Sequence, residues 1–381
     1  MQVEIVKEEK FRDLKIEWDQ LLSLSSTNAV YLTWEWLFTW WEIFGDDRRE
    51  LFIIAVRENG QLIGIAPLII HNVEDFNLFT FRRIEFLGTG EEEKDEVCSN
   101  YMDFIIAKGM EKEVINEIGG FLVNKQCIAW DELLLSSVSK DSLNLELFIE
   151  RFSESTKCKI KRAKILSCPY IKLTDDWEQY LKSLGDKTRR NIRKDRRELL
   201  NNGSLEYEAY NQADTYKYFD DFMSLHRKRW GDRLNQDAFS SDKFVSFHKN
   251  LSSLFSQKGW LKISFLKHDK KIIAASYHFI YNGRLYAYQV GCDDEYNKKF
   301  SIGITEFGFN IEDAIKKGYK EYDFYKASSV SYKWRMAKDK REVQDILIFR
   351  KDFKYYLVTC IRYLKTVRRK IKSLCRGKRK A

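Results

Sequence analysis

Segments that favour strands and segments that favour helices alternate along both halves of this chain, and this order limits the fold more than any other feature. In the first half we expect strands at residues 3–6, 51–57, 62–70, 83–87, 102–107 and 132–136, and helices at 12–23, 34–44 and 111–124. Asn59-Gly60, a strong hairpin signal, separates two of these strands. Such alternation predicts an α/β or α+β unit with a mixed sheet flanked by helices.

The second half repeats this order of elements without obvious sequence identity. We expect helices at residues 175–184, 187–201, 213–229, 241–256 and 302–317, and strands at 205–210, 261–267, 272–281, 285–292, 321–325 and 343–350. The repetition predicts a duplicated domain, with one copy in residues 1–170, a second in residues 171–352 and a tail in residues 353–381.

Composition excludes several classes of protein. Of the 381 residues 44% are hydrophobic and 15% aromatic, which is enough apolar material for packed cores and argues against disorder. Seven cysteines without a C-x-x-C pair and five histidines without metal spacing predict neither disulfides nor a metal site. No apolar run approaches 18 residues and the N-terminus is not a signal peptide, so we expect a cytoplasmic protein.

The positive charge of the chain is concentrated in two segments. Eleven of the 66 basic residues lie in residues 353–381, which hold no acid, so the rest of the chain has 55 bases against 57 acids and a net charge of −2. A second basic run, Lys187–Arg197, has seven bases and one acid. A protein that coats nucleic acid with a diffuse positive surface is therefore disfavoured.

One stretch has the order of a phosphate-binding element. The expected strand that contains Gln289 and Gly291 leads through a polar loop into a helix that opens with Ser301, Ile302 and Gly303. Backbone N–H groups at a helix start can bind a phosphate, so these five residues are the candidate donor-binding residues. The alternative is an ordinary strand–helix connection with Ser301 as its cap.

Several strings in the second half carry a resemblance to a known family. They are K-T-R-R-N-I-R-K-D-R-R-E-L from Lys187, L-H-R-K-R-W from Leu225, F-H-K-N-L from Phe247, G-W-L-K-I from Gly259, I-A-A-S-Y-H-F from Ile273, Y-Q-V-G-C-D from Tyr288, Y-D-F-Y-K from Tyr322 and S-Y-K-W-R from Ser331. This region resembles the acetyltransferase-like domain of the cellulose-biosynthesis CelD group, within the GNAT superfamily and close to the Fem peptidyltransferases. The first half resembles the same proteins more weakly, through T-W-E-W-L-F-T-W-W from Thr33 and G-I-A-P-L from Gly64.

The resemblance implies two tandem GNAT-like domains that share a cleft, and acyl-CoA, in particular acetyl-CoA, as co-substrate. Nearer to the Fem branch, it implies aminoacyl-tRNA as the donor. Two departures leave the donor open: the string R/Q-x-x-G-x-G/A of GNAT enzymes is absent, and Ser301-Ile302-Gly303 stands where the family often has S-P-G.

Four residues are candidates for catalytic roles. His226 is a candidate general base, with a partly buried structural histidine as the alternative. Asp323 follows a strand and either orients a base or an amine or caps a turn. Lys333 is placed to neutralise an oxyanion or a phosphate, and Asp103 is expected to face the cleft from the first domain.

The candidate substrate-binding residues are mostly basic. Arg189 and Arg193 recur on one face of an expected helix and suit the phosphates of a donor or of a lipid-linked sugar, although a solvated charged face is the alternative. Arg229 and Trp230 near a helix end, and Arg335 after a strand, complete the set.

The tail has a helical apolar stripe on a basic background. Its positions are Leu357, Ile361, Leu364, Val367, Ile371 and Leu374. A basic amphipathic helix suits an anionic membrane surface. A helix docked on the body or on a second copy, and RNA binding, are the alternatives.

Together these features favour a cytoplasmic acyltransferase, peripheral at the inner membrane face. It would transfer an acetyl group to an amine or hydroxyl of a small molecule or glycan precursor of the cell envelope or an exopolysaccharide. A Fem-like aminoacyltransferase that uses charged tRNA and a non-catalytic GNAT-like binding scaffold are the alternatives.

Overall fold

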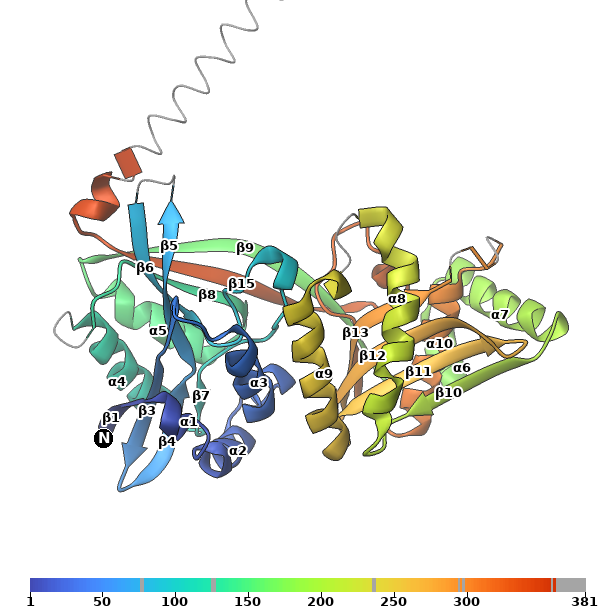
Figure 1. Ribbon diagram of the computed structural model, residues 1–381, viewed down its shortest axis with the longest axis horizontal. Coiled ribbons are helices and arrows are strands. Elements are labelled where there is room, and N and C mark those ends of the chain that lie inside the picture. Colours follow the sequence, from blue (N-terminus) through green and yellow to red (C-terminus); the bar gives the residue numbers. More distant parts are fainter. Residues whose placement is uncertain are drawn as a thin grey trace, which may run out of the picture.

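The computed structural model describes residues 1–75, 79–124, 128–234, 238–293, 295–296, 299–357 and 359–360, which form two α/β lobes (Figure 1). The helices are α1 (Glu8–Phe11), α2 (Lys15–Leu24), α3 (Trp34–Phe44), α4 (Glu111–Val123), α5 (Leu143–Ser153), α6 (Trp177–Ser183), α7 (Asp186–Asn201), α8 (Phe219–Leu234), α9 (Asp242–Gln257), α10 (Ile302–Lys316) and the short 3-10 turn η5 (Tyr332–Arg335). The strands are β1 (Gln2–Val6), β2 (Arg49–Leu51), β3 (Ile53–Glu58), β4 (Gln61–Ala66), β5 (Leu68–Asp75), β6 (Phe79–Phe86), β7 (Ile105–Ile106), β8 (Glu132–Ser139), β9 (Cys158–Lys172), β10 (Leu205–Tyr210), β11 (Leu261–His268), β12 (Lys271–Tyr281), β13 (Arg284–Cys292), β14 (Glu321–Asp323) and β15 (Asp339–Arg350).

One large sheet runs through both lobes. Its strand order is β10-β11-β12-β13-β14-β9-β15-β8-β6-β5-β2, and a separate small sheet of the first lobe has the order β1-β3-β4-β7. The pairs β13–β14 and β6–β8 are parallel, while the other pairs described here are antiparallel. The mixed α/β class expected from the sequence is therefore confirmed.

Most expected elements are present, and the differences have physical reasons. The expected strand 62–70 is two strands, because Pro67 lacks the N–H that a continuous ladder needs. β4 therefore joins the small sheet and β5 the large one. The expected strand 102–107 shrinks to Ile105–Ile106, and the residues before it form a loop. Of the tail, residues 353–357 are helical, whereas the stripe positions from Ile361 onward lie outside the described residues.

The long strands β9 and β15 lie side by side and link the lobes (Figure 1). β15 pairs along its length with β9 and also with β8 of the first lobe. β15, which comes late in the sequence, thus extends the part of the sheet that is formed by strands from the first half of the chain. The domain boundary expected at residue 170 falls inside β9 and stays a prediction.

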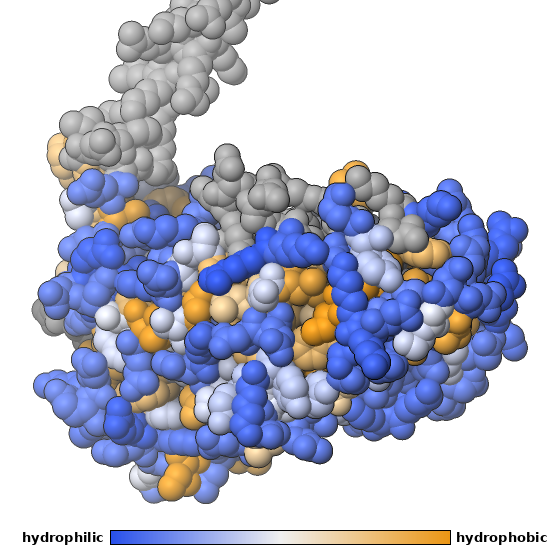
Figure 2. All heavy atoms as spheres, turned by 45° about the vertical axis from the view of Figure 1, so that its right-hand side comes forward, coloured by the Kyte–Doolittle hydropathy of each residue, from blue (hydrophilic) through white to orange (hydrophobic). Residues whose placement is uncertain are grey.

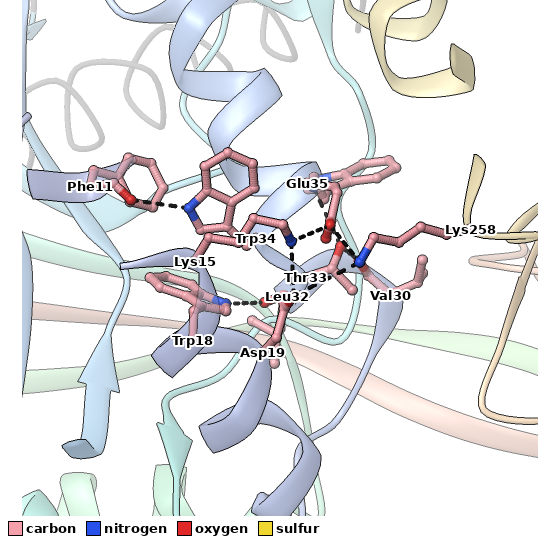
Figure 3. Close-up of polar contacts among 11 residues, drawn as sticks. Phe11, Lys15, Trp18, Asp19, Val30, Leu32, Thr33, Trp34, Glu35 and Lys258 are labelled. Carbon is pink, nitrogen blue, oxygen red and sulfur yellow. Dashed lines mark hydrogen bonds and ion pairs between the residues drawn. The ribbon is translucent and has the colours of Figure 1, made fainter. Parts of the chain in front are cut away.

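The lobes also meet where α3 packs on α9. Figure 3 shows the polar part of this contact, in which the Glu35 carboxylate lies between Lys15 of its own lobe and Lys258 at the end of α9. The Glu35 Oε1 atom is 2.5 Å from Lys15 Nζ and 2.9 Å from Lys258 Nζ. Burial alone raises the pKa of Glu35, but the hydrogen bonds from both lysines outweigh it and hold that pKa below its usual value.

β13 and β14 separate soon after they pair. They share only the register from Arg284–Glu321 to Tyr286–Asp323, after which β14 ends and β13 continues to Cys292. β13 then leads through a loop into α10, which covers one face of the sheet (Figure 1). The start of α10 and the end of β14 therefore lie around the place where the two strands part.

Candidate functional site

A pocket of about 310 Å³ lies at the start of α10. Its lining comes from three elements: Lys187, Thr188 and Asn191 of α7, Ser301 and Ile304 at the start of α10, and Arg335 of η5. Lys187 and Asn191 are four residues apart on α7, so they share one face of that helix. The structure thus brings together three segments that are distant in sequence.

The pocket is positively charged. Within the described residues, neither Lys187 nor Arg335 is paired with a carboxylate. The first turn of α10 has no acidic residue, and Ser301 makes no side-chain cap. Since the N-terminal end of a helix carries a partial positive charge, the helix and the two cations attract an anion together. Such an arrangement suits a phosphate group.

The predicted segment Ser301–Gly303 begins at this pocket. The backbone N–H of Ser301 donates to Asp195 Oδ2 of α7 at 3.1 Å, which ties the start of α10 to α7. Burial raises the pKa of Asp195, and the bond from Ser301 offsets part of that effect. Ile302 is buried, whereas a Cβ on Gly303 would have only Cys292 Sγ near it, at 3.9 Å.

Gln289 and Gly291 lie on β13, next to α8. A Cβ on Gly291 would come within 2.7 Å of the backbone N of His226 and 2.8 Å of its Cα, so the missing side chain lets α8 approach the strand. His226 is buried, and its Nε2 atom is 3.3 Å from Gln289 Oε1. Three residues predicted for two different roles therefore form one contact between helix and strand.

Asp323 and Lys333 meet at the boundary between the lobes. Asp323 is fully buried and its Oδ2 atom accepts a hydrogen bond from the Tyr101 hydroxyl of the first lobe at 2.6 Å. Burial raises the pKa of Asp323, an effect that this hydrogen bond partly offsets. The Lys333 ammonium donates to the backbone carbonyls of Phe324 and Lys326. Burial lowers the pKa of Lys333, and the nearby Asp323 opposes that shift.

Asp103 lies inside the first lobe. Its carboxylate accepts hydrogen bonds from Ser142 Oγ at 2.5 Å and Asn144 Nδ2 at 3.2 Å, both at the start of α5. Burial raises the pKa of Asp103 to about 6, against the effect of these hydrogen bonds. All its described partners belong to the first lobe. Tyr101 of the same loop does reach the second lobe, where its hydroxyl donates to Asp323.

The remaining predicted arginines lie away from the pocket lining. Arg189 pairs with Asp186 at 2.5 Å, and Arg193 pairs with Glu178 of α6. Both side chains leave the helix on a different face from Lys187, because residues two apart on a helix point in nearly opposite directions. Arg229 and Trp230 belong to α8, but their side chains lie outside the described residues.

A larger hollow of about 880 Å³ is lined mostly by the first lobe, with Asn250 of α9, and its acidic side chains outnumber its two arginines. Its acidic lining residues are Glu8, Glu9, Glu42, Asp46 and Asp47. In the described part of the chain, no group of His, Cys, Asp and Glu side chains is arranged to hold a metal ion. Figure 2 shows one face of the molecule, on which apolar residues gather in the middle between hydrophilic borders.

Sequence reasoning missed three residues that the geometry brings forward. Lys187 and Asn191 belong to the basic run that it singled out, and a helical wheel of α7 separates them from Arg189 and Arg193. The helical wheel was therefore the sequence signal that could have pointed to Lys187 and Asn191. Tyr101 had none, because only the folded chain brings it to Asp323.

Comparison with known families finds a match in the second lobe. Residues 186–334 match the family model described as an acetyltransferase (GNAT) domain. This segment contains α7, β13, α10 and five of the six lining residues; the sixth, Arg335, follows it directly. The match supports acyltransferase activity in general. Among curated proteins, none matches the chain.

Solved structures extend the likeness to both lobes. The crystal structure of FemX has a TM-score of 0.59 and 12% identity, and the match covers 94% of this chain and 99% of that one. A conserved protein of unknown function from Bacteroides thetaiotaomicron VPI-5482 has a TM-score of 0.53 at 9% identity, covering 92% and 100%. L-PGS from Bacillus licheniformis has a TM-score of 0.51 at 12% identity, covering 94% and 97%. At these identities the likeness shows the fold alone.

Proposed function

We propose that this protein is an acyltransferase whose donor carries a phosphate group, and that acyl-CoA, in particular acetyl-CoA, is that donor. The observation that carries the proposal is the pocket where Lys187, Arg335 and the start of α10 converge. The pyrophosphate of CoA would lie against Ser301–Gly303. Arginine and lysine are the side chains that hold phosphates through charge-assisted hydrogen bonds.

In this proposal the reaction takes place between the parted strands β13 and β14. An amine or hydroxyl of the acceptor attacks the thioester carbonyl, the new C–N or C–O bond forms, the C–S bond breaks, and the acceptor loses a proton. Lys333 has three N–H donors and uses two on the carbonyls of Phe324 and Lys326, so one remains for the developing oxyanion. Asp323 holds this region in place, and His226 is proposed as the base.

Calorimetric titration with CoA tests the donor pocket. We expect Lys187→Ala and Arg335→Ala each to weaken CoA binding about tenfold, the effect of one charge-assisted hydrogen bond. Lys316→Ala removes the same charge at the opposite end of α10 and serves as the matched control. Equal affinity in all four proteins would refute the pocket as the donor site.

The proposed acceptor is a glycan precursor of the cell envelope or an exopolysaccharide, which rests on the resemblance to the CelD group. Incubation with radiolabelled acetyl-CoA and envelope extract, followed by fractionation of the label, identifies the acceptor class. Label that stays in acetyl-CoA in every fraction, while CoA still binds, would favour a non-catalytic binding scaffold.

The second candidate is a Fem-like aminoacyltransferase that uses aminoacyl-tRNA. The observation that favours it is the fold likeness to FemX over both lobes. Arg190 and Arg197 of α7 are exposed and add to the basic surface around the pocket. RNA that copurifies with the protein, together with no calorimetric signal for CoA, would favour this candidate over the first.

The tail is proposed to bind an anionic membrane surface. Its described start is tied to the body through Lys354, whose Nζ atom is 2.7 Å from Asp131 Oδ2. No helix in the described residues has the length and apolar character needed to cross a bilayer. Truncation after Lys351 should abolish sedimentation with anionic vesicles, and salt should weaken binding of the full chain. Equal sedimentation of both forms would refute membrane binding, while a lower melting temperature of the truncated form would favour a docked helix.

A further inference from the structure

Asp323 joins three segments of the chain. Its Oδ2 atom accepts from the Tyr101 hydroxyl at 2.6 Å and from Arg341 Nη1 of β15 at 3.4 Å. Its Oδ1 atom accepts from the backbone N–H of Tyr325 at 2.8 Å. The carboxylate therefore fixes a loop of the first lobe, the central strand β15 and the turn that follows β14.

The turn after Asp323 places Lys333. Tyr325 has a φ of +63°, a left-handed conformation that a residue with a side chain rarely adopts without support. The support is the hydrogen bond from its N–H to Asp323. The carbonyls on either side of Tyr325, those of Phe324 and Lys326, are the two acceptors of the Lys333 ammonium. The position of the ammonium thus depends on the conformation of this turn.

The first lobe holds Tyr101 firmly against Asp323. Tyr101 itself has a φ of +55° and lies in a loop that both lobes anchor. The Val97 carbonyl of that loop accepts from Tyr288 of β13 at 2.8 Å, and the Ser99 hydroxyl accepts from the Trp36 indole at 2.9 Å. A separate bond from the Lys326 ammonium to the Ser137 hydroxyl of β8, at 2.6 Å, fixes the far end of the turn.

We propose that Tyr101 of the first lobe is a positioning residue for Lys333, acting through Asp323 and the turn at Tyr325. Lys333 lies in the second lobe, but the Asp323 carboxylate that supports the turn of its two carbonyl acceptors accepts a hydrogen bond from the first lobe. The first lobe then takes part in the reaction without contacting the acyl donor. The catalytic consequence rests on the proposed function, in which Lys333 stabilises the oxyanion.

Trace labelling of lysines with acetic anhydride, read by mass spectrometry, tests the positioning step without an acceptor. Exposed Lys187 is the internal reference. In Tyr101→Phe the freed turn should make Lys333 about tenfold more reactive relative to Lys187, the lower range for loss of a hydrogen bond to a charged group. Tyr31→Phe is the matched control, because Tyr31 is also buried near Tyr101 but its hydroxyl has no hydrogen-bond partner among the residues that the structure describes. Unchanged labelling of Lys333 in Tyr101→Phe overturns the inference.

A second variant covers the case in which Tyr101→Phe does not fold. Arg341→Gln removes the other side-chain donor to Asp323 and should raise the labelling of Lys333 in the same direction. Circular dichroism identifies which variants are folded. A folded Arg341→Gln whose Lys333 labels as in the wild type counts against the inference in the same way.

Turnover of radiolabelled acetyl-CoA with envelope extract tests the catalytic step. Tyr101→Phe should lower kcat about tenfold and leave the KM for acetyl-CoA unchanged, since the donor pocket is untouched. Lys333→Met should abolish transfer. If Lys333→Met is inactive while Tyr101→Phe is fully active, this inference is overturned and the proposed function is left intact. An active Lys333→Met overturns the role of Lys333 in the proposed function and the inference with it.

Discussion

α4 of the first lobe and α10 of the second each follow a strand and a loop, but their first turns differ in charge. α4 begins with Glu111 and Glu113, and the Glu111 carboxylate accepts the N–H of Gly109 at 2.7 Å. α10 begins without an acid and shares a pocket with Lys187 and Arg335. The first turn of α4 therefore carries its own acids at the positive end of the helix, whereas the first turn of α10 has none and only Asp195 of α7 meets its cap residue, Ser301.

α5 extends the contrast within the first lobe. Its cap Ser142 and the neighbouring Asn144 both donate to the buried carboxylate of Asp103. In the second lobe, the start of α10 has one carboxylate, Asp195, against two cations. Two lobes of similar order thus use their helix starts differently: the first for internal stability, the second, in our proposal, for donor binding.

The largest expected effect concerns Asp103 and the pH dependence of stability. Its folded pKa of about 6 lies above the ordinary value of 3.8, so the folded state binds the proton more tightly than the unfolded state does. Protonated Asp103 therefore stabilises the folded state below pH 4. At about 1.4 kcal/mol per pKa unit, this contribution to the free energy of unfolding is about 3 kcal/mol, and it is lost as the pH rises to 6. Asp103→Asn should remove that slope.

Urea unfolding of both proteins between pH 4 and pH 7 measures this difference. A constant difference in unfolding free energy over that range contradicts the buried position of Asp103. Loss of acetyl transfer in Asp103→Asn at unchanged stability would support the catalytic role that the sequence predicts for this residue.

The second effect comes from giving α10 an acid in its first turn, as α4 has. Ile304→Glu places a carboxylate in the pocket, and repulsion of about 2–3 kcal/mol should weaken CoA binding roughly 100-fold. An acid near a helix start stabilises the helix, so the melting temperature should not fall. Ile304→Gln is the uncharged control. Calorimetric titration with CoA compares the affinities of the two variants. Equal affinities would contradict the proposed difference between the starts of α4 and α10.

The third effect separates two glycines of the candidate donor segment. Gly291→Ala should destabilise the protein by about 1–3 kcal/mol, because the new Cβ collides with the backbone of His226 and overpacks the contact between α8 and β13. Gly303→Ala has room for its Cβ and is the matched substitution, expected to leave stability unchanged or slightly raised. Thermal unfolding compares them, and similar losses in both would contradict the close approach of α8.

Periodicity and turn signals predicted most of the elements, because the local pattern decides them. α3 and β10 match their expected bounds, and α7 and α10 match within one residue. Three elements were not predicted from the pattern: α1, α5 and β9. Pairing of β9 with β15, far along the chain, is a tertiary contact that local sequence does not encode. The same reason explains why the union of both lobes in one sheet was not foreseen.

The candidate site was predictable only where one segment supplied it. Ser301 at the start of α10 and the basic run on α7 follow from local order, and the structure brings them to one pocket with Arg335. Which face of α7 turns to that pocket depends on how the helix packs; Arg189 and Arg193, the stripe predicted from the sequence, do not line it, and their role as substrate contacts stays a prediction. The contact between Tyr101 and Asp323 joins residues from both lobes, so no local pattern encodes it.

The smallest effect concerns the two faces of α7. Arg189 and Arg193 form partly exposed ion pairs with Asp186 and Glu178, and such pairs contribute about 0–1 kcal/mol each. Arg189→Gln with Arg193→Gln should therefore change the free energy of unfolding by less than about 1 kcal/mol and the affinity for CoA by less than about twofold. Lys187→Ala, one face away on the same helix, should cost about tenfold in affinity. If the double variant loses as much affinity as Lys187→Ala, the anion is bound by the whole helix rather than by the pocket face alone, and the predicted role of Arg189 and Arg193 as substrate contacts is supported.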